Sequence, residues 1–243
     1  MENVDASSPT ISTGSSPVTY SPNRKQIASA SRDRTARPWD TGTGMCLHVL
    51  QGHTKEVHIV VYSPPQGDMV GSASYDNTVR WWDTATGGCT QTLTGHSQAV
   101  SSVDLSRRGD IIVSGSHDGT VRQWDVRAGE PTRHISSGHI SVVYQVKCSP
   151  KGDLVATCSK DKTVRLWDIQ TGLCHQTLRG HTNKVECAEF SPQGDLIATG
   201  SDDRTVRLWN VETGACTRTL AGHANGIKDV AYSPQGDPTC VCQ

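Results

Sequence analysis

The dipeptide Gly-His recurs in this chain at nearly constant spacing, and this recurrence constrains the fold more than any other feature. The histidines are His53, His96, His139, His181 and His223, at intervals of 43, 43, 42 and 42 residues. Between them the chain repeats an apolar-alternating segment, a Gly-Asp turn, a second apolar segment, an Asp-containing turn and a segment that ends at Trp. A period of roughly 40–45 residues predicts small repeated units that bury their apolar faces against their neighbours.

The segments within each repeat have the pattern of short β-strands. The opening segments of the four complete copies are residues 57–62, 100–105, 143–148 and 185–190. In the closing segments, side chains alternate, with Val79 and Trp81 on one side and Arg80 and Trp82 on the other. Because Gly, Pro and Asp turns bound every segment, the sequence predicts an all-β protein with essentially no helix.

The Gly-His openings and the Trp-Asp pairs make the chain similar to the WD40-repeat family from about residue 18 to 237. The resemblance implies four-stranded β-propeller blades, here at about residues 18–51, 52–94, 95–137, 138–179 and 180–221. A partial copy, 222–237, adds one extra strand. Residues 1–17, rich in Ser, Thr and Pro, are predicted to be disordered, and 238–243 form a tail. Among WD40 arrays, the chain most resembles those of fungal incompatibility and NACHT-type signalling proteins.

The first copy departs from the pattern, and the array is not complete. No Gly-His precedes it, and Pro38 stands in its third strand, where a central strand needs the N–H. Five blades and one extra strand predict an incomplete propeller, an open arc whose unpaired edges favour oligomerisation. The alternative is a five-bladed ring in which residues 222–236 lend a strand to the first blade. His223 would then join Ser29, Asp33 and Trp39.

Each complete copy contains a His, a Ser or Thr, an Asp and a Trp. The resemblance implies that these four form a buried hydrogen-bond network, a tetrad, running from Asp to His to hydroxyl to indole. The sets are His53, Ser72, Asp76 and Trp82; His96, Ser114, Asp118 and Trp124; His139, Thr157, Asp161 and Trp167; and His181, Thr199, Asp203 and Trp209. The hydroxyl residue two before the Asp is the alternative member. Four copies in one register indicate a scaffold rather than a Ser-His-Asp nucleophile, because an enzyme needs only one such site.

Two other repeated residues have structural interpretations. The arginines two residues before each Trp are predicted to make ion pairs between blades or to pack on the Trp; they are Arg37, Arg80, Arg122, Arg165 and Arg207. Cys46, Cys89, Cys174 and Cys216 occupy equivalent sites too far apart to pair, which predicts reduced thiols and an intracellular protein. We expect a cytoplasmic location, with the nucleus left open. Cys240 and Cys242 are interpreted as incidental thiols, not metal ligands.

Composition excludes several classes of function. The net charge of −1 creates no field that would attract nucleic acid or an anionic membrane. No apolar run approaches the roughly 20 residues that a membrane-spanning helix needs, and the N-terminus is not a secretory signal. No phosphate-binding loop, metal cluster or dinucleotide motif is present, so we expect no cofactor and no catalytic residues.

Loop residues that vary between copies are the best candidates for partner binding, because the scaffold does not dictate them. They are Arg32, Arg34, Lys55, Tyr75, His117, Lys160, Lys162, Asn183, Lys184 and Arg204. In the turns before the third strands, these side chains are basic against Asp202 alone, apart from the repeated turn Asp. The sequence therefore predicts a noncatalytic scaffold for other proteins, and acidic or phosphorylated segments are the predicted ligands. Alternatives are a stand-alone adaptor, such as a G-protein β-like scaffold or ubiquitin-ligase substrate receptor, and, remotely, a propeller enzyme.

Overall fold

The structure, a computed structural model, describes residues 18–127, 131–135 and 138–233, with the backbone alone for 131–135. Twenty strands form five antiparallel four-stranded sheets, the blades, each built from consecutive strands. No helix occurs among the described residues. The predicted all-β architecture of WD40-type blades is confirmed.

The blades repeat one order of strands. The first strands are β1 (Val18–Tyr20), β5 (Val57–Tyr62), β9 (Val100–Leu105), β13 (Val143–Cys148) and β17 (Val185–Phe190). The second are β2 (Gln26–Ala30), β6 (Met69–Ser74), β10 (Ile111–Ser116), β14 (Leu154–Ser159) and β18 (Leu196–Ser201). The third are β3 (Thr35–Asp40), β7 (Val79–Asp83), β11 (Val121–Asp125), β15 (Thr163–Asp168) and β19 (Thr205–Asn210). The fourth are β4 (Leu50–Gln51), β8 (Cys89–Leu93), β12 (Pro131–Ile135), β16 (Cys174–Arg179) and β20 (Cys216–Ala221).

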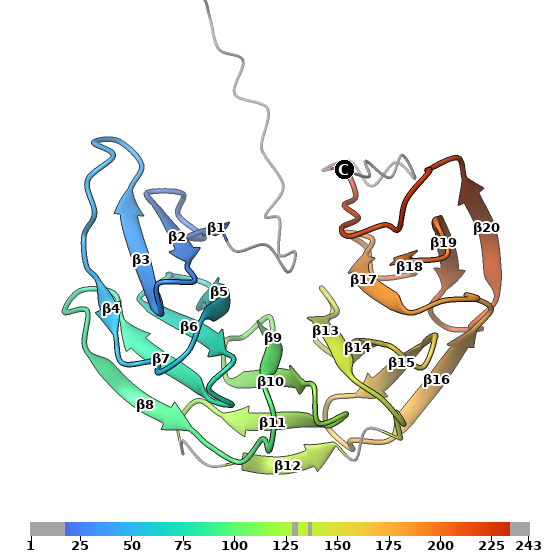
Figure 1. The fold of residues 1–243 in the computed structure, drawn as a ribbon, viewed down its shortest axis with the longest axis horizontal. Helices are drawn as coiled ribbons and strands as arrows, with labels where there is room; N and C mark the ends of the chain where they lie inside the picture. Colours follow the sequence, from blue (N-terminus) through green and yellow to red (C-terminus); the bar gives the residue numbers. More distant parts are fainter. Residues whose placement is uncertain (1–17, 128–130, 136–137, 234–243) are drawn as a thin grey trace, which may run out of the picture.

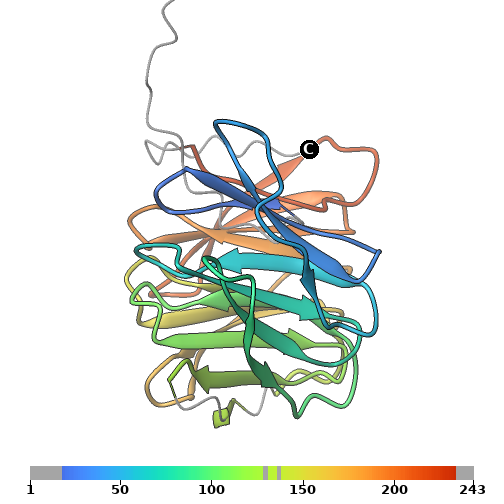
Figure 2. The ribbon, with the colours of Figure 1, turned by 90° about the vertical axis from the view of Figure 1, so that its left-hand side faces the viewer.

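The blades are arranged as an arc. The first strands of the second to fifth blades lie at its inner side and the fourth strands at its outer side (Figure 1). The connecting turns gather on two opposite faces, as the side view shows (Figure 2). Because neighbouring strands are antiparallel, the turns between second and third strands share one face with the loops that enter each next blade. We call this the loop face; the turns between first and second strands lie on the opposite face.

The core lies between blades rather than within any one of them. At the first interface, Ala28, Ala36 and Leu50 of the first blade pack against Val60, Tyr62 and Trp82 of the second. Related clusters of buried side chains fill the later interfaces. Each blade therefore depends on its immediate neighbours, as expected for a repeat array.

Pro38 shortens the outer edge of the first blade. Its equivalent in the second blade, Trp81, pairs with Gln91 of the fourth strand. In the first blade, β3 pairs with β4 only at Thr35 and Ala36. The missing N–H of proline accounts for the lost ladder.

The two ends of the chain do not join. Among the described residues, no strand of the first sheet pairs with the fifth, and the arc stays open (Figure 1). His223 is exposed and bonds to none of Ser29, Asp33 and Trp39, so the alternative of a five-bladed ring is wrong for this structure. Residues 222–233 form no named strand, unlike the predicted extra strand. Ile227, Val230 and Tyr232 nevertheless cover the face of the fifth blade that points away from the fourth blade.

None of the seven described cysteines forms a disulfide. Cys89, Cys174 and Cys216 begin fourth strands, and Cys46 precedes β4. The expectations for residues 1–17, for the tail 238–243 and for Cys240 and Cys242 fall outside the described residues.

Candidate protein-binding face

Hydrogen bonds join the four residues of each predicted tetrad. In the second blade, His53 Nδ1 lies 2.8 Å from Asp76 Oδ2, and His53 Nε2 lies 2.8 Å from Ser72 Oγ. Trp82 Nε1 donates to the same Oγ at 2.8 Å. A carboxylate only accepts, so Nδ1 carries the imidazole proton, Nε2 accepts, and the hydroxyl donates to it.

The same contacts recur in the next three blades. His96, His139 and His181 lie 2.8–3.1 Å from Asp118, Asp161 and Asp203 through Nδ1. Through Nε2 they lie 2.7–2.8 Å from the hydroxyls of Ser114, Thr157 and Thr199. Trp124, Trp167 and Trp209 donate to those hydroxyls at 2.8–2.9 Å. The alternative hydroxyls, two residues before each Asp, instead donate to carbonyls of the entering loops, as Ser74 does to Glu56.

The tetrads have the distances of a Ser-His-Asp triad but not its access. The side chains of Ser72, Ser114, Thr157 and Thr199 are fully buried. Each hydroxyl oxygen already accepts from the indole and donates to the imidazole, so no lone pair faces a substrate. This geometry stabilises the sheet and cannot perform a nucleophilic attack.

Each tetrad Asp also connects the turn before the third strand to the loop that enters the blade. Asp76 Oδ1 accepts from the backbone N–H and hydroxyl of Thr78, at 3.1 and 2.7 Å. Asp76 Oδ2 accepts from the Thr54 N–H at 2.9 Å in the entering loop. Threonine stands two residues after the Asp in all five blades: Thr35, Thr78, Thr120, Thr163 and Thr205. Sequence reasoning missed these threonines, although their repetition was a signal.

Burial and hydrogen bonding oppose each other in setting the tetrad pKa values. Burial would raise the pKa of Asp76, but hydrogen bonds from Thr78, Thr54 and His53 hold that pKa below its ordinary value. The same balance lowers the pKa of Asp203 to about 2. Burial lowers the pKa of His53 and His181, despite the opposing effect of the neighbouring carboxylates. The tetrad therefore favours a neutral imidazole beside a carboxylate.

We expect mild acid to destabilise the fold. The pKa of His53, His58, His117 and His181 lies below the ordinary 6.5 in the folded state, chiefly through burial. The unfolded chain therefore binds more protons below about pH 6.5, and the free energy of unfolding falls as the pH falls. The Asp carboxylates extend the loss below their ordinary pKa of 3.8. Urea unfolding between pH 7.5 and about pH 5 measures this; a midpoint that rises on acidification would contradict it.

Three of the five repeated arginines pack on the tryptophans of their own blades. The guanidinium carbons of Arg80, Arg165 and Arg207 lie 5.9–6.0 Å from the ring centres of Trp82, Trp167 and Trp209. They also lie against the glycines of the Gly-His pairs, because a Cβ built on Gly52 would be 2.5 Å from Arg80 Nη1. Among the described residues no ion pair between blades involves these arginines, so of the two interpretations the packing one holds.

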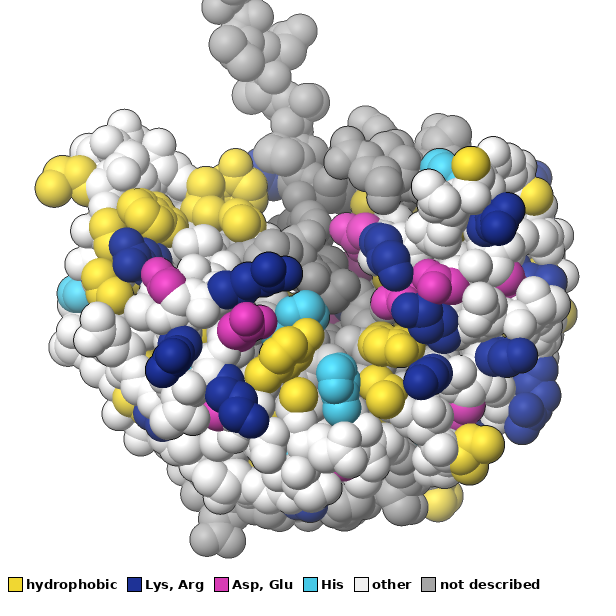
Figure 3. All heavy atoms as spheres, in the orientation of Figure 1, with side chains coloured by type: hydrophobic (Ala, Val, Ile, Leu, Met, Phe, Trp, Pro, Cys, Tyr) yellow, Lys and Arg dark blue, Asp and Glu magenta, His cyan; other side chains and the backbone are white. Residues whose placement is uncertain are grey.

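All ten predicted partner-binding residues lie on the loop face. Seven stand in the turns between second and third strands: Arg32, Arg34, Tyr75, His117, Lys160, Lys162 and Arg204. Lys55, Asn183 and Lys184 stand in the loops that enter the next blade. Figure 3 shows one face of the arc, with Lys and Arg side chains spread widely and histidine and hydrophobic side chains toward the centre.

Several basic residues occupy strained backbone positions. Arg34, Lys162 and Arg204 have φ of 72°, 70° and 69°, and Asn77 has 72°. The third blade has Gly119 at this position, with φ of 80°. A left-handed conformation costs a non-glycine residue roughly 1 kcal/mol. Three of the four non-glycine residues at this turn position are basic despite that cost.

At the fifth blade, two lysines are neutralised by acids. Lys184 pairs with Glu186 and with Asp202, and Lys228 pairs with the same two acids at 3.1 and 3.2 Å. These pairs do not include Arg204, which stands in the same blade. Lys160, Lys162 and Arg204 are exposed and make no ion pair within the described residues. The locally basic character of the turns before the third strands stays a prediction.

A row of rings crosses the loop face from the second blade to the fourth. The His58 and Tyr75 rings stack with centres 5.3 Å apart, and Tyr75 lies 5.8 Å from His117. His117 meets the edge of Tyr144 at 6.4 Å, and Lys184 of the fifth blade lies 5.3 Å from the Tyr144 ring centre. We call these rings the aromatic row. It offers a flat amphipathic surface of the kind enriched in protein interfaces.

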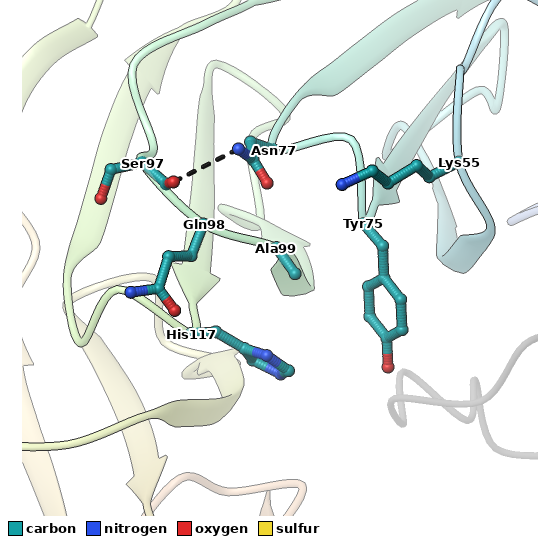
Figure 4. A pocket seen from close by; sticks show the side chains of 7 residues that line it. All are labelled: Lys55, Tyr75, Asn77, Ser97, Gln98, Ala99 and His117. Carbon is teal, nitrogen blue, oxygen red and sulfur yellow. Dashed lines mark hydrogen bonds between the residues drawn. The ribbon is translucent and has the colours of Figure 1, made fainter.

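A shallow hollow of about 460 Å³ lies beside the aromatic row, between the second and third blades. Figure 4 shows its lining, with Tyr75 and His117 below and Lys55 on one side. The Asn77 side chain donates to the Ser97 carbonyl at 3.3 Å across the hollow. The hollow therefore combines a basic group, two side-chain amides and two aromatic rings.

Comparison with known families identifies the repeat. The family model described as "WD domain, G-beta repeat" matches residues 44–83, 87–125, 129–168, 172–210 and 214–237, most of the chain. This chain belongs to the WD40 family. Members of this family generally serve as protein-interaction scaffolds and are typically noncatalytic. Each of the first four matched WD40 repeats begins near a fourth strand and ends with the third strand of the next blade, so these repeats span two blades each.

Curated WD40 relatives match only short segments. Nuclear distribution protein PAC1 of Arthroderma benhamiae is 55% identical over 38 residues, 16% of this chain and 8% of that protein. The Lissencephaly-1 homolog of Glossina morsitans morsitans is 50% identical over 38 residues, 16% and 9% of the two chains. Dynein assembly factor with WD repeat domains 1 of Xenopus laevis is 35% identical over 51 residues, 21% and 12%. This chain thus spans about a tenth of these relatives' length, and the particular likeness to fungal incompatibility proteins stays a prediction.

The described part of this WD40 chain has neither a membrane-spanning helix nor a metal cluster. No helix there is long and apolar enough to span a membrane. No group of three His, Cys, Asp or Glu side chains there is placed to hold a metal ion.

Sequence reasoning found two rings of the aromatic row and missed the other two. Tyr75 and His117 were predicted from their turns. His58 and Tyr144 are the second residues of β5 and β13, where the other blades have Ser101 and Glu186. Variation at this strand position was a signal, but only the arc brings strand and turn residues together.

Proposed function

We propose that this WD40 chain is a noncatalytic scaffold that binds acidic or phosphorylated segments of partner proteins on its loop face. In this proposal it acts as the sensor or adaptor part of a signalling assembly. One observation carries the proposal: exposed basic residues that make no ion pair within the described residues share the loop face with the aromatic row. Lys162 and Arg204 hold left-handed backbone positions that glycine or asparagine would fill with less strain.

The chemistry of the face suits such a ligand. Phosphate and carboxylate groups form charge-assisted hydrogen bonds with Lys and Arg, which are about twice as strong as neutral ones. The aromatic row would receive the apolar part of the same segment, because Tyr and His rings present flat surface with a polar edge. The tetrads hold the turns and loops in place through their Asp residues, so the face is preorganised.

A charge reversal tests the proposal. The probe is a fluorescein-labelled, Glu-rich peptide that carries phosphoserine, and binding is followed by anisotropy. Lys160→Glu combined with Lys162→Glu should weaken binding about tenfold or more, which corresponds to ~1.4 kcal/mol. Binding to the unaltered chain should also weaken as salt rises from about 0.05 to about 0.2 M.

The control is an equal change of charge on the opposite face. Arg108 and Lys151 are exposed in the turns after β9 and β13. Arg108→Glu combined with Lys151→Glu should leave the affinity within about twofold. Equal effects of the two double variants, or no effect of either, would refute the loop face as the binding surface.

A further inference from the structure

The first blade contains a tetrad that lacks its histidine. Trp39 donates to Ser29 Oγ at 2.9 Å, as in the other blades. Asp33 accepts from Thr35 at 2.9 and 2.6 Å, but its second oxygen meets only Arg37, at 3.2 Å. The Asp33 side chain is 48% exposed, against 5% for Asp203. The first blade therefore has three of the four groups in place and an open position for an imidazole.

The other end of the arc presents the missing histidine. Gly222 and His223 follow β20 just as Gly180 and His181 follow β16. Gly222 and His223 are both exposed, whereas His181 is buried. The backbone is already in the repeat conformation, with φ of 153° at Gly222 and 155° at Gly180. A Cβ on Gly180 would lie 2.5 Å from Arg207, whereas nothing lies within 4 Å of one on Gly222. This Gly-His pair is formed but has no blade to complete.

The first strand of the first blade, β1, and residues 227–232 at the other end of the arc differ in length. In the second blade, β5 pairs with β6 from Val57 to Tyr62, whereas β1 pairs with β2 only from Val18 to Tyr20. Residues 227–232 lie on the fifth blade without forming a named strand. Within the described residues, the first strand of the first blade is thus three residues long, whereas residues 227–232 match the length of a complete first strand.

Equivalent side chains show that the two ends are made to the same pattern. Val18 and Tyr20 correspond to Val230 and Tyr232 in the Val-x-Tyr-Ser-Pro sequence. Val230 and Tyr232 are 2% and 7% exposed on the fifth blade, while Val18 and Tyr20 are 47% and 54% exposed, with no described blade packed on them. The apolar face of the first blade is therefore the unpartnered side of an interface that occurs four times elsewhere in the molecule.

We propose that copies of this chain associate head to tail. Residues 222–232 of one copy replace β1 as the first strand of the next copy's first blade, and His223 completes that blade's tetrad. His223 then bonds to Asp33 and Ser29 of the next copy, and Gly222 packs on its Arg37. The longer segment displaces the shorter because it pairs along the whole of β2 while its Val and Tyr fill the same places.

The partner is a second copy rather than the same chain. Within one chain, four packed blade interfaces fix the curvature and keep the two ends apart (Figure 1). The contact joins two different surfaces, so each dimer keeps one free head and one free tail. Such a heterologous contact grows into longer chains or closes into a ring of several copies.

Sedimentation velocity with complementary variants tests this assembly. The unaltered chain should show an average mass that rises with concentration beyond that of one copy. His223→Ala removes the tail and Asp33→Ala removes the head, and each should weaken association at least tenfold. Both residues are exposed in the single copy, so the far-ultraviolet dichroism should not change. An equal mixture of the two variants should form dimers and nothing longer, because only one functional head and one functional tail remain.

The control is His175→Ala, which removes an exposed histidine of β16 and should assemble like the unaltered chain. Three results would overturn the proposal. They are a chain that stays monomeric at every concentration, a His223→Ala variant that assembles normally, and a variant mixture that yields no dimer. A monomeric chain whose urea midpoint falls on His223→Ala would also overturn it, in favour of closure within one chain.

Discussion

Replacing Asp203 by alanine should lower the free energy of unfolding by about 3 kcal/mol, because several buried donors lose their acceptor at once. Asp203 accepts from His181 at 2.8 Å, from the Thr182 N–H at 2.9 Å, and from Thr205 at 3.0 and 2.6 Å. His181 and Thr199 stay buried after the change and cannot recover these bonds from water. Urea unfolding of a dilute sample measures the loss.

The first blade supplies the matched control for this experiment. Asp33 occupies the equivalent position but is about half exposed and has no histidine. Asp33→Ala should cost about 1 kcal/mol or less, because water replaces the carboxylate. Equal losses from the two variants would show that the imidazole contact contributes nothing. Peptide binding by the Asp203 variant should fall only in proportion to the loss of folded protein.

Gly180→Ala should have the second large effect, a loss of about 3 kcal/mol in the free energy of unfolding. Its φ of 155° strains any residue with a Cβ. The new Cβ would also lie 2.5 Å from Arg207 Nη1 and 3.3 Å from the Trp209 ring, which packs beneath the arginine. Overpacking of this kind typically costs about 1–3 kcal/mol beyond the strain.

Gly222→Ala is the control for that substitution, because its φ is almost the same and its surroundings are empty. The two variants share the backbone strain, so the difference between them measures the contact with Arg207 and Trp209. We expect Gly222→Ala to cost about 1–2 kcal/mol less than Gly180→Ala. The comparison requires dilute, monomeric samples. A Gly222→Ala loss as large as that of Gly180→Ala would assign the whole effect to φ.

The sequence alone predicted the features that repeat. A fixed period, alternating strands and turn residues recur in several registers, and errors in one copy are corrected by the others. The hydroxyl four residues before each tetrad Asp is the one that meets the imidazole, because a hairpin places it opposite the third strand near Trp. Pro38 marked the first blade as irregular, and β4 is indeed cut to two residues.

Features that arise once could not be predicted in this way. The aromatic row combines turn residues of the second and third blades with strand residues of the second and fourth, and its contacts depend on the curvature of the arc. The pairing of Lys184 with Glu186 and Asp202 depends on side-chain positions that charge counting does not show. Whether the propeller closes could not be derived from the sequence either, because the sum of four rotations between blades decides whether His223 reaches Asp33.

Within the described residues, the first blade packs against one neighbour only, so local unfolding should begin there. Stability in a row of blades is a sum over adjacent pairs, so a blade with one neighbour opens more readily than a blade with two. At the opposite end, Ile227, Val230 and Tyr232 cover the fifth blade and stand in for its absent neighbour. Amide protons of β2 and β3 should therefore exchange with solvent sooner than those of β18 and β19. Fraying starts at the first blade and moves toward the fifth, in the same order in which the blades leave the ribosome.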